Sequence, residues 1–184
     1  QARRMGAEGM GFESLVAGPE RSFGIHAFPT FTAGPFANKG LSILDFGLRF
    51  EGYTSDVTMS FVDNLLNQEQ KTMIDLVEEA HRIAVEACGP GVSLLKVATL
   101  VDEFFANAGW FMPHSLGHGI GLDAHELPTL SMRAMPDDLL LPGHIVTIEP
   151  GLYHPELGGV RLENDVLITD TGAEVITHSR IVRL

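Results

Sequence analysis

The sequence predicts an α+β domain built on a largely antiparallel sheet. Residues 41–61 alternate between apolar and polar side chains, as β-strands do, and two helix-like patterns follow at 68–88 and 94–108. From residue 110 onward the chain again reads as strand and loop, so strands flank a helical pair without strict β-α-β alternation. A chain of 184 residues is long enough for one domain with a substantial core.

The first forty residues predict little regular structure. Residues 1–9 read like the tail of a helix, and the chain does not begin with Met, so we expect a piece of a longer protein. Residues 12–19 read as a short strand. The segment 22–40 is a loop rich in Gly, Pro and aromatic residues, and it carries His26.

Residues 41–61 predict a β-hairpin whose two-residue turn is Glu51-Gly52. In this register Gly47 faces Asp56, and Asp45 and Asp56 become diagonal neighbours on one face, with Cβ atoms roughly 7 Å apart. Carboxylates that close repel each other unless they are protonated or bridged by cations. Two interpretations stay open, a solvated polar face and the wall of a cavity. Alternation also predicts that the opposite face belongs to the core; it carries Leu44, Phe46, Leu48, Phe50, Tyr53, Val57, Met59 and Phe61.

Two helices follow the hairpin. Asn67 is the predicted N-cap of the first, which ends before the run Gly89-Pro90-Gly91. Ser93 is the predicted N-cap of the second, which ends at Gly109. The buried face of the first helix is predicted to carry Met73, Ile74, Val77, Ala80 and Ala84.

Two residues of the first helix carry side chains with chemistry of their own. His81 has no acidic or histidine cluster nearby in the sequence, so we interpret it as a surface or packing histidine and expect its replacement by Ala to leave activity unchanged. Cys88 is the chain's only cysteine and reads as a small core residue. A single cysteine excludes a disulfide framework and fits a reducing, cytoplasmic compartment.

Two acids end or interrupt strands in the last third of the chain. Glu149 ends an apolar strand run and is followed at once by Pro150-Gly151; an acid at the inner end of a buried strand is costly unless it is paired or bound to metal. Glu163 lies in a strand whose alternation puts it on one face with Arg161 and Asp165. An Arg161–Glu163 surface pair is the alternative, and such a pair contributes little to stability.

The composition limits the classes of partner. The chain has 12 basic and 24 acidic residues, a net charge of −12, which argues against a nucleic-acid surface or an anionic membrane as partner. Solubility explains such acidity for most of these carboxylates, and convergence on cations explains it for a few. We find no signal peptide and no apolar run near the length of a membrane span.

The stretch from His114 to Glu126, HSLGHGIGLDAHE, holds three of the chain's eight histidines. Its glycines argue against a helix, so His118 and His125 are not ligands one turn apart as in HExxH. A G-x-G-x-G run without a P-loop lysine is weak evidence for phosphate binding. Taken alone, each of these histidines is more often structural than catalytic.

Taken together, the acids and His118 form an ordered series: Asp45, Asp56, His118, Glu149 and Glu163. In order, spacing and local context this series resembles the pita-bread metallopeptidases, the family of methionine aminopeptidase, aminopeptidase P and prolidase. The resemblance runs from about Leu15 to Leu184. His26, His114 and Arg161 stand at positions that resemble those of the Xaa-Pro branch of that family. Asn164, in contrast, stands where Asp is common.

The resemblance implies a pita-bread fold, a curved and mostly antiparallel sheet with helices on its outer face. Residues 1–184 would form one catalytic domain, with an upstream N-terminal domain missing. The activity implied is hydrolysis of the Xaa-Pro bond of dipeptides or of peptide N-termini by a metal-bridging hydroxide. Relatives of this kind often work as homodimers, which we expect here.

The resemblance also implies roles for the site residues. Asp45, Asp56, His118, Glu149 and Glu163 would hold two divalent cations, Mn²⁺ or Co²⁺ first and Zn²⁺ or Fe²⁺ as alternatives. Asp45 would be bidentate on one ion, Asp56 and Glu163 would bridge, and His118 and Glu149 would complete the other. Glu149 would also accept a proton. His26, His114, His125 and Arg161 would act on substrate or support the site without binding metal directly.

Two alternatives keep the fold and change the function. A metal-dependent lyase or a creatinase-like hydrolase would act on a small non-peptide substrate. A non-catalytic peptide-binding module would use the cleft for binding alone. Retention of all five ligand positions argues against a metal-free enzyme and against the binding module.

Overall fold

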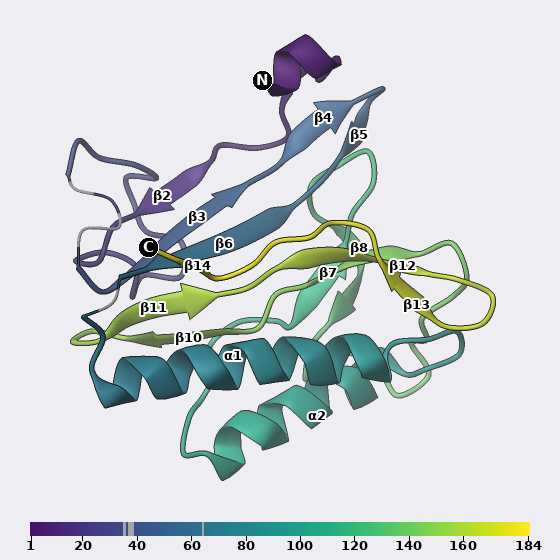
Figure 1. The fold of residues 1–184 in the computed structure, drawn as a ribbon. Helices are drawn as coiled ribbons and strands as arrows, with labels where there is room; N and C mark the ends of the chain where they lie inside the picture. The colour runs from purple at the N-terminus through teal and green to yellow at the C-terminus, as the bar shows by residue number, and fades with distance from the viewer. Residues whose placement is uncertain (35, 37–38, 64) are drawn as a thin grey trace.

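The structure is a computed structural model that describes residues 1–34, 36, 39–63 and 65–184 (Figure 1). A 3₁₀ helix at Ala2–Met5 stands where the sequence predicts the tail of a helix. The helices are α1 (Gln68–Ala87) and α2 (Leu94–Asn107). The strands are β1 (Gly9–Met10), β2 (Leu15–Ala17), β3 (Leu41–Phe46), β4 (Leu48–Phe50), β5 (Tyr53–Thr54), β6 (Val57–Val62), β7 (Gly117–Gly119), β8 (Glu126–Leu130), β9 (Ile145–Ile148), β10 (Gly151–His154), β11 (Gly158–Arg161), β12 (Asn164–Ile168), β13 (Ala173–Val175) and β14 (Val182–Arg183).

Two main sheets meet at the centre of the molecule. One has the strand order β14-β6-β3-β2 and the other β13-β12-β9-β7-β8, and β10 and β11 pair separately. Neighbouring strands are antiparallel except β14 and β6. Helices α1 and α2 lie side by side against one face of the second sheet and of the β10–β11 pair (Figure 1). The architecture is the predicted α+β arrangement. Among the described residues no helix is both long and apolar enough to cross a membrane.

The hairpin forms in the predicted register. Phe50 pairs with Tyr53 and Asp45 pairs with Thr58, so one register holds from the turn to the far end of the ladder. The turn residues Glu51 and Gly52 have φ values of 50° and 82°. Positive φ at both positions is the geometry of a two-residue type I′ turn, whose twist matches that of the strands.

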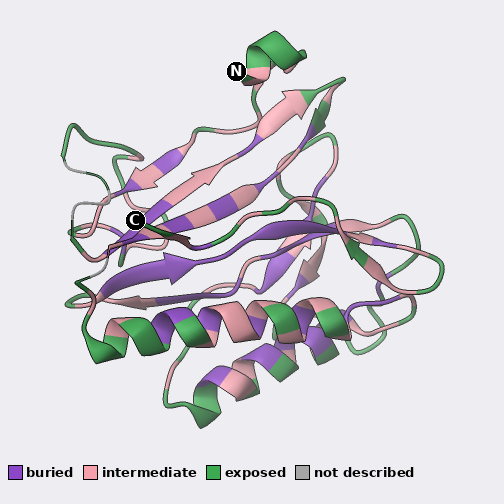
Figure 2. Cartoon of the chain, viewed as in Figure 1, coloured by how far each residue is buried: buried purple, intermediate pink, exposed green. Residues whose placement is uncertain are grey.

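The prediction of which hairpin face joins the core was wrong. Along β6 the polar side chains of Thr58 and Ser60 are fully buried, whereas Val57, Met59 and Phe61 are only half-buried (Figure 2). Alternation separates two faces but does not say which one points inward. Here the polar face turns inward because it meets the second sheet and lines a cleft.

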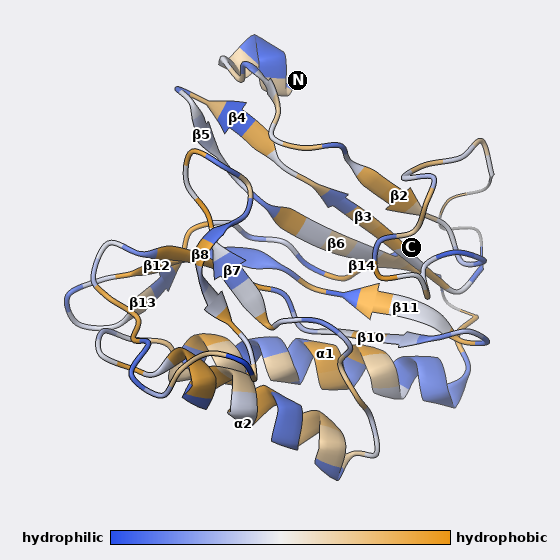
Figure 3. Cartoon of the chain, turned by 180° about the vertical axis from the view of Figure 1, so that it is seen from behind, coloured by the Kyte–Doolittle hydropathy of each residue, from blue (hydrophilic) through white to orange (hydrophobic). Residues whose placement is uncertain are grey.

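Helix caps and helix burial follow the sequence. Asn67 accepts the N–H of Gln70, and the Gln70 side chain accepts the N–H of Asn67, which is a complete capping box. Ser93 stands at the predicted N-cap of α2 without a side-chain capping bond. Seen from behind, hydrophobic and hydrophilic stretches alternate along both helices (Figure 3). The main core lies between the apolar sides of the two helices and strands β9 to β12, and it includes Cys88.

The two main sheets join along a seam between β6 and the chain that runs from β11 into β12. The two segments lie antiparallel, and both side chains and backbone groups make the bonds that cross between them. These bonds join Ser60 with Arg161, Thr58 with Glu163, and Asp56 with Asp165. The seam therefore brings residues about a hundred positions apart in the sequence into one row.

Candidate metal centre

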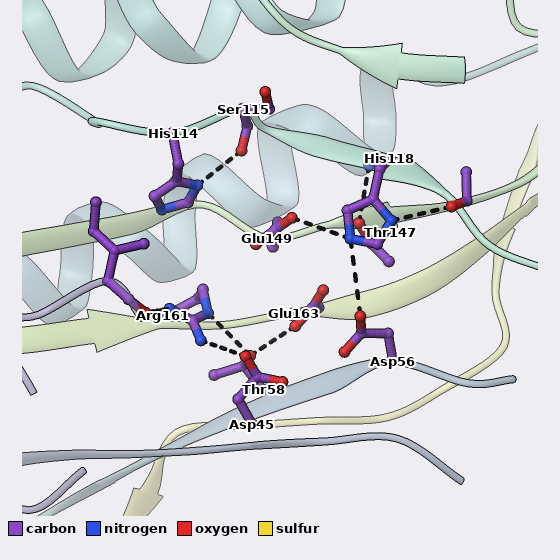
Figure 4. Close-up of polar contacts among 12 residues, drawn as sticks. Asp45, Asp56, Thr58, His114, Ser115, His118, Thr147, Glu149, Arg161 and Glu163 are labelled. Carbon is purple, nitrogen blue, oxygen red and sulfur yellow. Dashed lines mark hydrogen bonds and ion pairs between the residues drawn. The ribbon is translucent and has the colours of Figure 1, made fainter. Parts of the chain in front are cut away.

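One cleft of about 440 Å³ gathers the predicted ligands. Asp45 comes from β3, Asp56 from just before β6, His118 from β7, Glu149 from just after β9, and Glu163 from between β11 and β12 (Figure 4). The cleft is lined in addition by His26, His114 and His125. Strands from both sheets thus place four carboxylates and several imidazoles around one space.

The ligand atoms lie close enough to share cations. Three overlapping groups have their oxygen and nitrogen atoms within 4.8 Å of one another. The groups are Asp45–Asp56–Glu163, His118–Glu149–Glu163 and Asp56–His118–His125. The third includes His125, which the resemblance places beside the metals without binding them.

His118 presents one ring nitrogen to the acids. Its Nδ1–H donates to the carbonyl of Gly119 at 3.0 Å, so Nε2 carries the lone pair. That Nε2 lies 3.5 Å from Glu149 Oε1 and 3.8 Å from Asp56 Oδ2. The neutral, oriented imidazole is the form that binds a cation.

The glycines around His118 allow close backbone approach. A Cβ on Gly117 would lie 1.8 Å from the carbonyl oxygen of Thr147, and one on Gly119 would lie 2.4 Å from that of Leu127. Either contact is impossible for a residue with a side chain. The glycines therefore allow β7 to pack closely between β8 and β9. This packing explains the glycine-rich run without a phosphate-binding loop.

Burial and mutual repulsion raise the pKa values of the clustered acids. Burial, then the charges of Asp45 and Glu149, raise the pKa of Asp56 to about 9. Burial is also the main cause that raises the pKa of Glu149 to about 7, and burial with the neighbouring carboxylates raises the pKa of Glu163 well above its usual range. The four carboxylates cannot all be charged without cations among them.

Two carboxylate oxygens in the cleft have no hydrogen-bond partner among the described residues. They are Oδ1 of Asp45 and Oδ1 of Asp56, and both are buried. Buried carboxylate oxygens are stabilised by protons or by cations. Four carboxylates and one imidazole are a donor set that suits hard or borderline divalent ions, so the residues present fit a metal centre.

Arg161 is a buried member of the site and pairs with Asp45. Its Nη2 donates to Asp45 Oδ2 at 2.6 Å, and its Nε donates to Thr58 Oγ1 at 3.0 Å. The alternative of a surface pair with Glu163 was wrong, because Arg161 is only 1% exposed. Thr58 in turn donates to Glu163 Oε2 at 2.6 Å, which ties the two acids to one another.

The sequence did not predict a role for Tyr153, whose hydroxyl links Arg161 to His114. The hydroxyl accepts from Arg161 Nη1 at 2.9 Å and donates to His114 Nε2 at 3.0 Å. His114 Nδ1–H donates to the carbonyl of Ser115 at 2.8 Å, and burial lowers the pKa of His114 to about 4. Both nitrogens of this neutral ring thus have protein partners. The available signal was position, since Tyr153 lies in the strand that directly follows Glu149.

His26 and His125 stand at other walls of the cleft. Burial and the charge of Arg161 lower the pKa of His26, which favours its neutral form. The His125 ring is exposed, with its centroid 4.5 Å from that of His118 and 6.4 Å from that of Phe12. The structure therefore brings every predicted site residue to one place.

Comparison with known proteins identifies the family of the chain. The profile of metallopeptidase family M24 matches residues 1–170. The Xaa-Pro dipeptidase of Pyrococcus furiosus is 37% identical over 178 residues, covering 95% of this chain and 49% of its own length. The prolidase of Pyrococcus horikoshii OT3 superposes with a TM-score of 0.90 at 34% identity, over 97% of this chain and 51% of that one. The X-Pro aminopeptidase of Thermotoga maritima superposes with a TM-score of 0.86 at 33% identity, over 98% and 51%.

The fold and the cluster of acids define a pita-bread metallopeptidase domain. The chain belongs to metallopeptidase family M24. It spans about half the length of the curated relatives it matches.

Proposed function

We propose that this chain carries the catalytic centre of a peptidase that holds two divalent cations and hydrolyses Xaa-Pro bonds. The observation that supports the proposal best is the convergence of four carboxylates and the free Nε2 of His118 on one cleft. Relatives named Xaa-Pro dipeptidase and X-Pro aminopeptidase support the choice of substrate bond. The cytoplasmic location, the homodimer and the assignment of 1–184 to one catalytic domain stay predictions.

Asp45, Asp56, His118, Glu149 and Glu163 would hold the cations, Mn²⁺ or Co²⁺ first and Zn²⁺ or Fe²⁺ as alternatives. When bound, two such cations lower the pKa of a coordinated water and polarise a carbonyl group. Asp45 Oδ2 accepts from Arg161, whereas Oδ1 has no hydrogen-bond partner among the described residues, so Oδ1 is the oxygen we propose for a cation. Bidentate binding by Asp45 stays a prediction.

Glu149 is the proposed proton acceptor. Its carboxylate belongs to the cluster of proposed ligands, with Oε1 3.5 Å from His118 Nε2. A general base must lie within reach of the proton it accepts, and the Glu149 carboxylate lines the cleft that would hold the peptide. Glu149 can therefore accept a proton from the attacking water and release it to the leaving proline nitrogen.

The histidines divide into two kinds. His26 and His125 line the cleft, and no hydrogen bond to either ring is found among the described residues, so they can donate to the carbonyl oxygen of a bound peptide. His114 has both ring nitrogens occupied, so we propose that it positions Tyr153 and, through it, Arg161. A leaving proline nitrogen carries no N–H, which gives added importance to groups that deliver its proton.

Metal binding and hydrolysis by the 184-residue chain test the proposal. Calorimetry should find two Mn²⁺ or Co²⁺ ions per chain, and Xaa-Pro dipeptides or Xaa-Pro-Yaa tripeptides should be cleaved only when metal is present. Binding of metal and peptide without cleavage would instead support a non-catalytic binding module. Cleavage or elimination only on small non-peptide substrates would support the lyase or creatinase-like alternative.

A further inference from the structure

Asn164 lies directly after Glu163 and faces the other way. Successive side chains of a strand point to opposite faces, so the Glu163 carboxylate enters the cleft while the Asn164 carboxamide turns toward helix α1. Asn164 is 3% exposed, and among the described residues its side chain hydrogen-bonds to His81, Thr177 and Ser179 rather than to a proposed ligand. A buried amide on this side of β12 needs partners of its own.

The carboxamide has a partner for each of its two ends. Its Oδ1 accepts the N–H of Ser179 at 2.6 Å and the hydroxyl of Thr177 at 3.3 Å. Its Nδ2 lies 3.2 Å from Nε2 of His81 on α1. Because Oδ1 is fixed by a backbone donor, Nδ2 must be the donor to His81, and His81 must be neutral with its proton on Nδ1.

The neutral form of His81 fits its surroundings. Burial lowers the pKa of His81 to about 4. The neighbouring core residues of α1 are apolar, among them Val77, Ala80 and Ala84. His81 is therefore an acceptor held by the helix at a fixed height above β12.

Residues 176–179, which hold the Asn164 carboxamide, are also linked to Asp56 through Asp165. Thr177 Oγ1 accepts the N–H of Asp165 at 2.8 Å, and Ile176 donates its N–H to the Asp165 carbonyl at 2.9 Å. Asp165 Oδ2 then accepts the backbone N–H of Asp56 at 3.2 Å. Residues 176–179 thus hold β12 in place immediately after Glu163 and, through Asp165, the backbone of Asp56.

We propose that Asn164 and His81 are positioning residues that fix strand β12 at Glu163 and so set the affinity of the metal centre. The inference rests on the proposed function and extends it to a helix that does not line the cleft. It replaces the expectation that His81 is dispensable. Loss of the acceptor on His81 would free the Asn164 amide, and β12 would then sample positions that misplace the Glu163 carboxylate.

The test compares His81→Leu with His81→Gln in the full chain. Leu keeps the bulk and removes the acceptor, whereas Gln keeps an acceptor oxygen. For His81→Leu we expect Mn²⁺ affinity, measured by calorimetry, to fall by about tenfold, the lower end of the effect seen for groups that orient metal ligands. Gln should restore most of it. Wild-type ¹⁵N spectra should show His81 with its proton on Nδ1.

Two control variants separate positioning from folding. Val77→Ala removes buried core volume from the same helix and should lower the melting temperature while leaving Mn²⁺ affinity unchanged. Arg82→Ala removes the exposed neighbour of His81 and should change neither. Equal affinity losses in His81→Leu and Val77→Ala would mean that stability alone is responsible and would overturn the inference.

The remaining outcomes distinguish this inference from the proposed function. If wild type binds and cleaves while His81→Leu binds Mn²⁺ equally well, the positioning role is wrong and the proposed function stands. If wild type binds no divalent metal under any condition, both fail. A spectrum with the His81 proton on Nε2 would also contradict the positioning pair.

Discussion

The four carboxylates of the candidate metal centre lie on two pairs of strands, and the two pairs are connected differently. Asp45 lies in β3 and Asp56 just before β6, and the two strands are joined through a short hairpin with a two-residue turn. Glu149 and Glu163 flank β9 and β12, and between them the chain makes a separate excursion through β10 and β11. Continuing the β9–β12 register by one residue sets Glu149 opposite Glu163.

The two pairs also differ in what covers them. Strands β11 and β12 are buried on both faces, with the helices on one side. Strand β6 buries only its polar face, and its apolar face is half-buried. The hairpin therefore joins the second sheet through the polar seam it makes with Arg161 and Glu163, while its Leu41, Ile43 and Val62 are buried in the hydrophobic core. In this molecule the candidate metal centre is also part of the junction between the two sheets.

The largest expected effect comes from removing one ligand on either side of the seam. If both strand pairs serve one centre, Asp56→Ala and His118→Ala should each abolish Xaa-Pro hydrolysis and lower the number of Mn²⁺ ions bound per chain. Asp75→Ala, which removes an exposed acid of α1, should do neither. Full metal content and full rate in His118→Ala would show that the site is assigned wrongly.

Removing the Tyr153 hydroxyl should have an intermediate effect. Tyr153→Phe deletes the group that links Arg161 to His114, so kcat/KM should fall by about 10- to 100-fold, as it does when other groups that orient a metal ligand are lost. The only other tyrosine in the chain gives a matched control: Tyr53 is exposed, and Tyr53→Phe should be silent. Equal kcat/KM for the two variants would exclude a role for this link.

The metal-free chain should lose stability as the pH rises from about 6.5 to about 9. The pKa of Glu149 is raised to about 7 and that of Asp56 to about 9, whereas unfolded carboxyl groups titrate near 4. Above about pH 4 the folded chain therefore holds protons that the unfolded chain has released. The free energy of unfolding falls with rising pH until the pH exceeds the pKa values of Glu149 and Asp56 in the folded chain. His81 and His114, with pKa values lowered to about 4, act oppositely, but only below the ordinary histidine pKa of about 6.5.

Thermal unfolding in EDTA and in Mn²⁺ checks this pH dependence. Metal binding replaces the protons on these carboxylates, so Mn²⁺ at a hundred times its dissociation constant should add about 2.7 kcal/mol for each of the two proposed sites and remove the loss of stability at high pH. Stability in EDTA that is flat or rising across this range would contradict the clustered carboxylates.

The sequence predicts those parts of the fold that depend on local rules. The hairpin register follows from Glu51-Gly52 and alternation, and the start of α1 follows from the Asn67 capping box. The order, spacing and local context of five residues predict all of the proposed ligands, because few sequences match a family at five such positions by chance. These predictions needed no knowledge of which strands meet.

What the sequence could not predict depends on long-range contacts. Alternation along β6 gave two faces, and only contact with the other sheet decides that Thr58 and Ser60 point inward. Tyr153 looked like an ordinary strand residue because its partners, Arg161 and His114, become neighbours only after folding. His81 was assigned to the surface or core for the same reason, since Asn164 lies 83 positions away.

The smallest expected effect is in the hairpin turn. Gly52 has a φ of 82°, and a Cβ there would meet no other atom within 4 Å, so Gly52→Ala is opposed by backbone strain alone. The free energy of unfolding should fall by roughly 1 kcal/mol. Metal affinity and kcat/KM should not change, because the ladder from Leu41 to Val62 holds Asp45 and Asp56 in register beyond the turn. Urea denaturation measures the first quantity, and weakened metal binding would show instead that the turn sets the geometry of the hairpin acids.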